Sequence, residues 1–218
     1  MRHWWKALAI ILLLYTLIAG LLIPVPKQVI LYESIRNLYF HVPMWFTMIF
    51  LFFMSVINSV KNLSSNNLTH DTKAKELVNA GIVFGVLGII TGSIWAKYTW
   101  GAWWVNDVKL NGSAITMLIY LAYVVLRGSL EDEQKRARIS AVYNIFAFVL
   151  LLVFIGILPR VTDSLHPGNG GNPGFNNYDL DDNMKLVFYP AVLGWILLGW
   201  WIASIRIRIS NLSQKLEA

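Results

Sequence analysis

The chain has 218 residues, of which 56% are hydrophobic and only 14% are charged. Soluble domains carry roughly 25% charged residues, so this composition favours a protein whose solvent is lipid. The sequence contains no cysteine, which excludes disulfides, thiolate metal sites and the CxxCH attachment site of c-type cytochromes. Membrane spans take up most of the length, so we expect one membrane domain covering residues 1–218.

Six segments are apolar over nearly the ~20 residues that a helix needs to cross a bilayer core. They predict an all-α integral membrane protein with six transmembrane helices, at residues 7–24, 42–60, 77–95, 113–126, 141–158 and 186–204. The first segment could also be a signal peptide, because Arg2 and Lys6 precede it. Its length and the lack of an Ala-x-Ala site favour an uncleaved span.

An even number of spans places both termini on the same side of the membrane. Lysine and arginine residues are distributed twelve to six in favour of that side, whereas acidic residues are split six and six. Because basic residues concentrate in cytoplasmic segments, we expect both termini in the cytoplasm. This bias explains the net charge of +6 without nucleic acid binding. We interpret the cytoplasmic loops as solvated connectors.

The connection between the first two spans reads QVILYESIRNLYFHVP. Its apolar residues between Tyr32 and Tyr39 recur at helical spacing, which predicts a short external helix lying in the membrane interface. His41 ends this segment, and Pro43 is expected to open the second span, where its missing N–H costs nothing.

The connection between the third and fourth spans is rich in tryptophan and also contains an acidic residue. It holds Trp95, Trp100, Trp103, Trp104 and Asp107. One interpretation is an aromatic belt at the membrane surface. The other is a flat aromatic platform for a planar ligand. Both interpretations stay open at this point, although a belt does not need four tryptophans beside an aspartate in one loop.

Two of the histidines, His41 and His166, fall on the non-cytoplasmic side, whereas His3 and His70 fall on the other. One histidine at a helix end is usually a hydrogen-bonded surface residue, but two beside a tryptophan-rich loop favour a ligand role. Haem iron takes two axial ligands, and neutral imidazoles serve well. The anionic propionates of haem need cations, and the same face carries Arg36, Lys97, Lys109 and Arg160.

Three stretches resemble the CcmC family of haem-handling proteins in cytochrome c maturation. Asn37–Pro43 (NLYFHVP) is similar to the family's first histidine motif, Trp100–Leu110 (WGAWWVNDVKL) to its tryptophan-rich WWD signature, and Ser164–Gly168 (SLHPG) to its second histidine motif. Two positions depart from the family: Asn106 stands where it usually has tryptophan, and Lys109 where it usually has arginine. Lysine lacks the planar fork that binds a carboxylate at two points.

The resemblance implies a multi-pass protein of the bacterial inner membrane that binds haem b transiently and non-covalently on its periplasmic face. His41 and His166 would be the axial ligands of the iron. The porphyrin and its propionates would contact Trp95, Trp100, Trp103, Trp104, Asp107, Arg36 and Lys109. The haem would pass to the periplasmic chaperone CcmE, in association with the ABC-type proteins CcmA and CcmB. No catalytic turnover is implied.

Other classes of protein make different demands on the sequence. A b-type membrane cytochrome that stacks two haems needs about four histidines within its spans. A transporter predicts ionisable residues in mid-span, and the predicted spans contain none at their middles. Gly81, Gly85, Gly88 and Gly92 in the third span indicate tight helix packing, which suits a structural assembly factor but also every other class. The related haem handlers CcmF and CcsA carry more spans and histidines.

Overall fold

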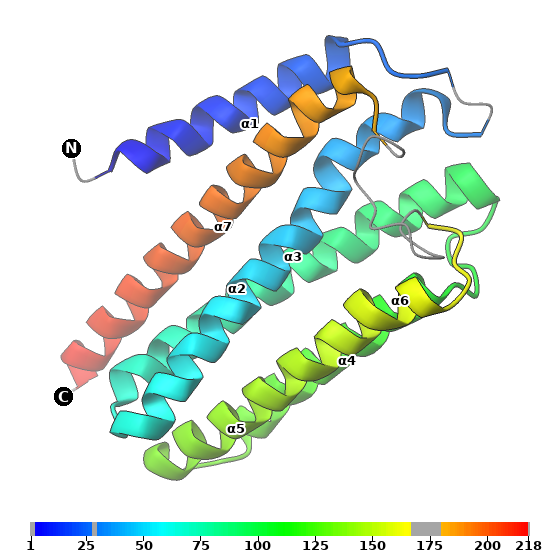
Figure 1. Ribbon diagram of the computed structural model, residues 1–218. Helices are drawn as coiled ribbons and strands as arrows, with labels where there is room; N and C mark the ends of the chain where they lie inside the picture. Colours follow the sequence, from blue (N-terminus) through cyan, green and yellow to red (C-terminus); the bar gives the residue numbers. More distant parts are fainter. Residues whose placement is uncertain (1–2, 28–29, 167–179, 218) are drawn as a thin grey trace.

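The computed structural model of the chain describes residues 3–27, 30–166 and 180–217, and these ranges contain helices and no strand. Figure 1 shows an elongated bundle whose long helices run side by side. In chain order the elements are α1 (Trp4–Leu22), η1 (Tyr32–Asn37), α2 (Leu38–Ser65), α3 (Leu68–Trp100), α4 (Val108–Gly128), α5 (Glu133–Leu151), η2 (Leu152–Ile157), α6 (Leu158–Val161) and α7 (Asp182–Glu217).

Within the described ranges, six helical segments are long and apolar enough to cross a membrane. They are Trp4–Leu22, Tyr32–Ser65, Leu68–Trp100, Val108–Gly128, Glu133–Val161 and Asp182–Leu216. Each overlaps one predicted span, so the prediction of an all-α protein with six helices long and apolar enough to span a membrane is confirmed. Only 22–39% of the residues in their most apolar windows are buried inside the bundle. The remaining apolar surface suits contact with lipid.

Several helices extend beyond the apolar stretch that predicted them. The third begins at Leu68, because the side chain of Asn67 accepts a hydrogen bond from the backbone N–H of Thr69 at 2.9 Å and so caps the helix. The sixth span continues as α7 to Glu217, well past residue 204. A run of apolar residues indicates only the part of a helix that lies inside the membrane. The polar extensions of these helices were therefore not predicted.

The bundle has two distinct ends. Both chain termini lie at one end, together with the α2–α3 and α4–α5 connections, and we call this the terminus end (Figure 1). The opposite end carries the C-terminal ends of α1, α3 and α6 and the N-terminal ends of α2, α4 and α7, and we call it the distal end. The predicted cytoplasmic location of the terminus end still rests on the distribution of basic residues.

The glycines of the third span form the surface against which α2 packs. Large side chains of α2 lie over them. Counted from the distal end inward, the pairs are His41 over Gly92, Trp45 over Gly88, Met48 over Gly85 and Phe52 over Gly81. A β-carbon at any of these glycines would lie 2.5–2.8 Å from the paired side chain. The predicted tight packing is therefore a row of side chains set into a glycine groove.

Prolines inside two helices are accommodated differently. Pro190 in α7 cannot donate to the carbonyl of Leu186, and the hydroxyl of Tyr15 in α1 donates to that carbonyl instead, at 3.1 Å. Pro43 was expected to open the second span, but α2 already begins at Leu38 and follows η1 without a break. The predicted helical turn before the span therefore exists, and its position relative to the bilayer stays a prediction.

Candidate functional site

His41 lies near the start of α2 at the distal end, and its ring is held against α3. The absence of a side chain at Gly92 leaves room for the ring, since a β-carbon there would lie 2.6 Å from Cε1. Nδ1 of His41 lies 3.0 Å from Oγ1 of Thr91. The rings of Trp45 and Trp95 pack edge-on to the imidazole, with centroids 6.3 and 5.9 Å away. These contacts fix the orientation of the imidazole.

The hydrogen bonds of Thr91 select the tautomer of His41. The threonine hydroxyl donates to the carbonyl of Leu87 at 2.8 Å. A hydroxyl has one proton to donate, so toward His41 it acts as the acceptor and Nδ1 carries the proton. In a neutral imidazole the lone pair then resides on Nε2. Nε2 is thus the nitrogen of His41 that can bind a metal.

Asp107 links the start of α4 to the segment that follows α6. As the N-cap of α4, its Oδ1 accepts hydrogen bonds from the backbone N–H groups of Lys109 at 2.9 Å and Leu110 at 3.3 Å. Its Oδ2 accepts from Oγ of Ser164 at 2.9 Å and from the N–H of Leu165 at 2.8 Å. The side chain is only 1% exposed. Asp107 is therefore enclosed by protein rather than open to a ligand.

The same carboxylate holds His166. Nδ1 of His166 lies 3.0 Å from Oδ1 of Asp107, and the ring of Trp100 packs edge-on to the imidazole with centroids 5.0 Å apart. A carboxylate on one nitrogen of a ligating histidine fixes its tautomer and orientation. Here it leaves Nε2 for a ligand, and the side chain of His166 is 26% exposed. Pro167 and Gly168, which complete the second histidine motif, lie outside the described residues.

The electrostatics of this pair favour a charged aspartate and a neutral histidine. Burial lowers the pKa of His166, the charge of Asp107 partly offsets this, and the charge of Lys109 lowers it further. Burial by itself raises the pKa of Asp107. The N–H of Leu165, the positive charge that His166 carries when it is protonated, and the hydroxyl of Ser164 outweigh that effect and hold the pKa of this carboxyl below its ordinary value. A neutral imidazole is the form that binds a metal.

Two histidines from distant parts of the sequence contact the same end of α3. The C-terminal end of α3 serves both, since Trp95 contacts His41 and Trp100 contacts His166. Five residues of helix separate these tryptophans, which is about 7.5 Å along the axis. The structure thus places both predicted ligands at the distal end, in contact with the C-terminal end of α3.

The four predicted tryptophans fall into two kinds. Trp95 and Trp100 pack against the histidines, whereas the side chains of Trp103 and Trp104 are 59% and 41% exposed. Nε1 of Trp104 donates to Oδ1 of Asn111 at 3.2 Å, and the amide of Asn111 donates to Oδ1 of Asn106 at 2.8 Å. The residue that departs from the family motif is therefore part of the support of Trp104. Both the belt and the platform interpretation suit the exposed pair.

Arg36, one of the predicted cations, donates hydrogen bonds to carbonyls at the C-terminal end of α1. Its Nη1 donates to the carbonyls of Gly20 at 2.8 Å and Ile23 at 2.7 Å, and its Nε pairs with Glu33 at 2.6 Å. A positive charge at a helix C-terminus is favourable because the last carbonyls lack helical partners. Only 17% of the Arg36 side chain is exposed. Its contact with a propionate stays a prediction, and the geometry supports a structural role.

The other predicted cations also have partners in the structure. Lys97 donates to the carbonyl of Gly101 at 2.9 Å, and Arg160 donates to the carbonyl of Gly156. Lys109 is half-buried and close enough to His166 for its charge to act on the imidazole. Of these three cations, Lys109 is the one that the structure associates with a histidine.

Three residues of the site were not predicted as such. Thr91 and Ser164 orient the two histidine segments, and Gly92 was assigned only to helix packing. The sequence gave a weak indication of Ser164, because a serine hydroxyl often accepts a hydrogen bond from the backbone N–H two residues further along the chain. Here Oγ of Ser164 accepts from the N–H of His166 at 3.1 Å. Nothing in the sequence marked Thr91, which lies 50 positions from His41.

The fold and the site define a multi-pass membrane protein with two half-buried imidazoles and four tryptophans at one end of its bundle. The whole chain, residues 1–218, matches the family model for CcmC, described as Heme exporter protein C. The chain therefore belongs to the CcmC family, and the resemblance seen in its three motifs is confirmed.

Individual relatives agree with this assignment. Heme exporter protein C of Paracoccus denitrificans is 27% identical over 191 residues, which cover 85% of this chain and 76% of the relative. Heme exporter protein C of Escherichia coli K12 is 26% identical over 183 residues, covering 81% and 70%. Cytochrome c biogenesis protein CcsA of Prochlorococcus marinus is 35% identical over 108 residues, covering 46% and 34%.

Proposed function

We propose that the protein binds haem at its distal end and hands it on for cytochrome c biogenesis. The observation that carries the proposal is that both histidines have the same hydrogen-bonding arrangement, with Nδ1 facing an oxygen. Nδ1 of His41 faces the hydroxyl of Thr91 and Nδ1 of His166 faces the carboxylate of Asp107. With Nδ1 protonated, the lone pair of each imidazole resides on Nε2, and an axial ligand of haem requires such a lone pair. The names of the relatives support a role in haem handling and cytochrome c biogenesis.

In this proposal His41 and His166 are the axial ligands, and the haem is cargo rather than a resident cofactor. Trp95 packs against the imidazole of His41, and Trp100 packs against the imidazole of His166. The exposed faces of Trp103 and Trp104 contribute aromatic contact to the porphyrin. The protein binds, orients and releases its cargo without catalytic turnover.

We further propose that the distal end faces the periplasm of a bacterial inner membrane. The terminus end carries twice as many basic residues as the distal end, which is the bias expected of a cytoplasmic side. A site at the end of the bundle is open to a soluble partner, whereas a site in the middle of the bilayer is not. This suits delivery to the periplasmic chaperone CcmE and association with the ABC-type proteins CcmA and CcmB.

The proposal is tested by the visible absorption spectrum of the purified protein. We expect a Soret band with the features of bis-histidine haem. His41→Ala or His166→Ala should convert it to a five-coordinate spectrum or lower the haem content, and added imidazole should restore part of the original spectrum. His70→Ala is the matched control, because His70 lies at the terminus end. Unchanged spectra in both single variants would rule out the assignment.

A further inference from the structure

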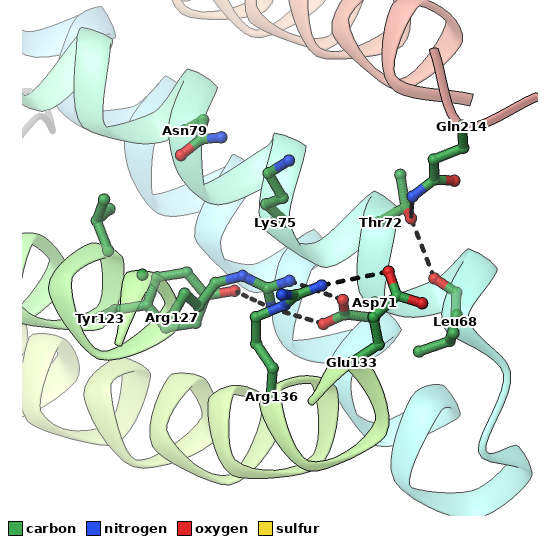
Figure 2. A pocket seen from close by; sticks show the side chains of 12 residues that line it. Leu68, Asp71, Thr72, Lys75, Asn79, Tyr123, Arg127, Glu133, Arg136 and Gln214 are labelled. Carbon is green, nitrogen blue, oxygen red and sulfur yellow. Dashed lines mark hydrogen bonds and ion pairs between the residues drawn. The ribbon is translucent and has the colours of Figure 1, made fainter. Parts of the chain in front are cut away.

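The terminus end contains a polar cavity that the haem site does not use. It has a volume of about 420 Å³ and lies where the ends of α3, α4, α5 and α7 meet (Figure 2). It is lined mainly by polar and charged side chains, among them Asp71, Lys75, Arg127, Glu133 and Arg136. The 33 residues of α3 extend about 50 Å, from this cavity to the histidines. The cavity is thus a separate candidate site, and its volume is typical of small-molecule sites (roughly 300–1,000 Å³).

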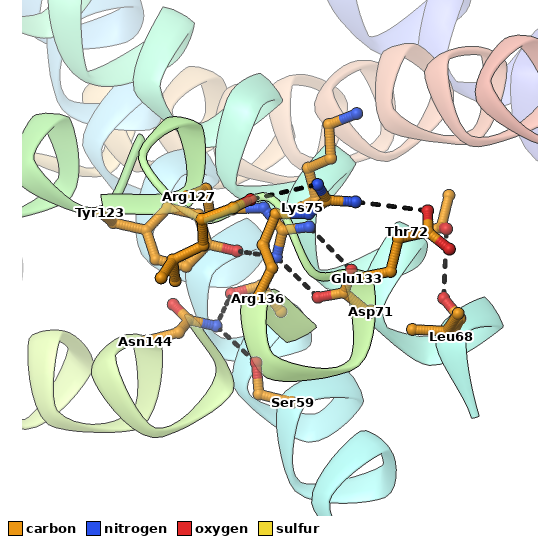
Figure 3. Close-up of polar contacts among 12 residues, drawn as sticks. Ser59, Leu68, Asp71, Thr72, Lys75, Tyr123, Arg127, Glu133, Arg136 and Asn144 are labelled. Carbon is orange, nitrogen blue, oxygen red and sulfur yellow. Dashed lines mark hydrogen bonds and ion pairs between the residues drawn. The ribbon is translucent and has the colours of Figure 1, made fainter. Parts of the chain in front are cut away.

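One wall of the cavity is a rigid ion pair. Arg127 of α4 contacts both carboxylate oxygens of Asp71 of α3, at 2.6 and 2.7 Å, and each side chain is only 11% exposed. The guanidinium also lies 5.8 Å from the ring centroid of Tyr123. Figure 3 shows this pair beside Asn144, whose amide donates to Ser59 at 2.9 Å deeper in the bundle. Breaking a buried pair of this kind is costly, so Arg127 and Asp71 form the frame of the cavity.

Two other cations of the cavity are held more loosely. Nζ of Lys75 lies 3.3 Å from Glu76, and Nη2 of Arg136 lies 3.3 Å from Glu133. Strong charge-assisted hydrogen bonds are shorter, about 2.7–2.9 Å. Arg136 also donates a long hydrogen bond to the carbonyl of Leu130, at 3.4 Å. Its partner Glu133 is 64% exposed, and such an exposed pair contributes little stability. Glu76 is only 6% exposed, but the Lys75 side chain that reaches it is 43% exposed. Lys75 and Arg136 can therefore turn toward another anion at small cost.

If Lys75 and Arg136 move to another anion, their present carboxylate partners are still stabilised. Oε2 of Glu76 accepts from Nε of Arg206 at 2.9 Å, so Glu76 keeps an ionic partner when Lys75 moves. Glu133 is largely exposed and would be solvated by water. An anion entering between Lys75 and Arg136 thus does not strand a buried negative charge.

The charges of the lining residues indicate what the cavity accepts. Lys75, Arg127 and Arg136 supply three positive charges against the two negative charges of Asp71 and Glu133. The excess of one positive charge complements a single negative charge, as on a phosphodiester. The cavity also lies at the end of a membrane-spanning bundle, where basic pockets between helices bind anionic lipid headgroups.

The surface next to the cavity suits a lipid better than a free anion. Val124 lines the cavity and is 41% exposed. Leu121 and Val125, on the same face of α4, are 44% and 72% exposed. This apolar strip leads from the cavity along the outside of the bundle, where acyl chains can pack. A soluble phosphate would gain nothing from the strip.

We propose that the cavity binds the phosphodiester headgroup of a phospholipid from the leaflet at the terminus end, with Lys75 and Arg136 as its anion contacts and the acyl chains along α4. The lipid joins the ends of α3, α4 and α5 at a place remote from the haem site. The proposal does not depend on haem binding, because no residue is shared between the two sites.

Native mass spectrometry of the full-length protein tests the proposal. The probes are dioleoylphosphatidylglycerol, dioleoylglycerol, which has the same acyl chains without phosphate, and inorganic phosphate alone. We expect adducts of the phospholipid to form at concentrations at least tenfold lower than those of either other probe. The double variant Lys75→Gln/Arg136→Gln should lose the phospholipid adduct at least fivefold. The matched control is Lys135→Gln/Arg138→Gln, which removes the same charge from exposed positions outside the cavity, and its adduct should be unchanged.

Other results would overturn the proposal. Equal loss in the test and control variants indicates attraction to the basic surface in general. Equal binding of dioleoylglycerol removes the role of the phosphate, and equal binding of inorganic phosphate assigns the cavity to a soluble anion. The variant Lys75→Arg/Arg136→Lys keeps both charges and should keep the phospholipid, which separates a charge effect from misfolding. The Soret band of each variant reports independently on the distal end.

Discussion

Nδ1 of His166 lies 3.0 Å from Oδ1 of Asp107, and the same carboxylate caps α4 and binds the N–H of Leu165. Asp107 therefore sets the position of His166 relative to the end of α3 without being open to a ligand itself. The sequence predicted Asp107 as a contact of the porphyrin. That contact stays a prediction, and the hydrogen bonds of Asp107 support a role in orienting His166.

Asp107→Asn tests this positioning role. Asparagine is as good an N-cap as aspartate, so α4 should remain intact, but the amide cannot stabilise the imidazole as a carboxylate does. We expect haem affinity to fall about 10–100-fold, the range typical for loss of such outer partners. Haem titration followed in the Soret region measures the change. Asp163→Asn is the control, because Asp163 is exposed. Equal affinities of Asp107→Asn and the unmodified protein would contradict the positioning role.

Gly92→Ala tests whether the glycine groove holds His41 in place. A β-carbon at Gly92 would lie 2.6 Å from Cε1 of His41, so the imidazole must move or rotate. We expect a loss of the bis-histidine spectrum at nearly unchanged protein yield. Gly156→Ala is the matched control, because a β-carbon there meets no atom within 4 Å. A normal spectrum in Gly92→Ala would show that the ring does not need this space.

The parts of the fold that follow from local composition could be predicted. Six apolar runs gave six spans, and the two histidines and the tryptophans were identified by residue type and side of the membrane. The contacts that orient them could not be predicted, because Thr91 and Asp107 lie 50 and 59 positions from the histidines that they hold. Such pairs are set by which helix faces meet, and apolar periodicity alone does not give that pairing.

The sequence was least informative at the terminus end. The predicted cytoplasmic loops were interpreted as solvated connectors, and helix ends with charged residues looked the same as exposed ends elsewhere. In the structure Asp71 and Glu76 are only 8% and 5% exposed, because the polar extensions of α3 and α7 continue the bundle beyond the apolar spans. The polar extensions of these helices have no regular spacing of apolar residues, so the sequence does not show which of their charged residues are buried.

Tyr15→Phe tests the contact that compensates for Pro190 in α7. The hydroxyl of Tyr15 donates to the carbonyl of Leu186, which has no N–H partner at position 190. Removing the hydroxyl should destabilise the fold by about 1–2 kcal/mol, as for a polar group left without its hydrogen bond. Thermal unfolding in detergent measures this, and Tyr98→Phe is the control, because Tyr98 is 78% exposed. With Pro190→Ala in the background, the effect of Tyr15→Phe should shrink, since an alanine at that position restores the helical donor.

Arg127→Leu tests the buried ion pair at the terminus end. The substitution leaves Asp71 buried without its guanidinium, and an uncompensated buried charge of this kind costs about 3–5 kcal/mol. Arg136→Leu breaks a pair whose carboxylate partner is 64% exposed, and such pairs contribute about 0–1 kcal/mol. The two variants remove the same chemical group from neighbouring positions of one cavity, so their difference isolates burial. Asp71→Leu/Arg127→Leu should recover much of the loss, because two apolar side chains can replace a buried pair nearly neutrally. Free energies of unfolding in mixed micelles measure all three variants. If Arg127→Leu costs no more than Arg136→Leu, the pair is solvated and does not frame the cavity.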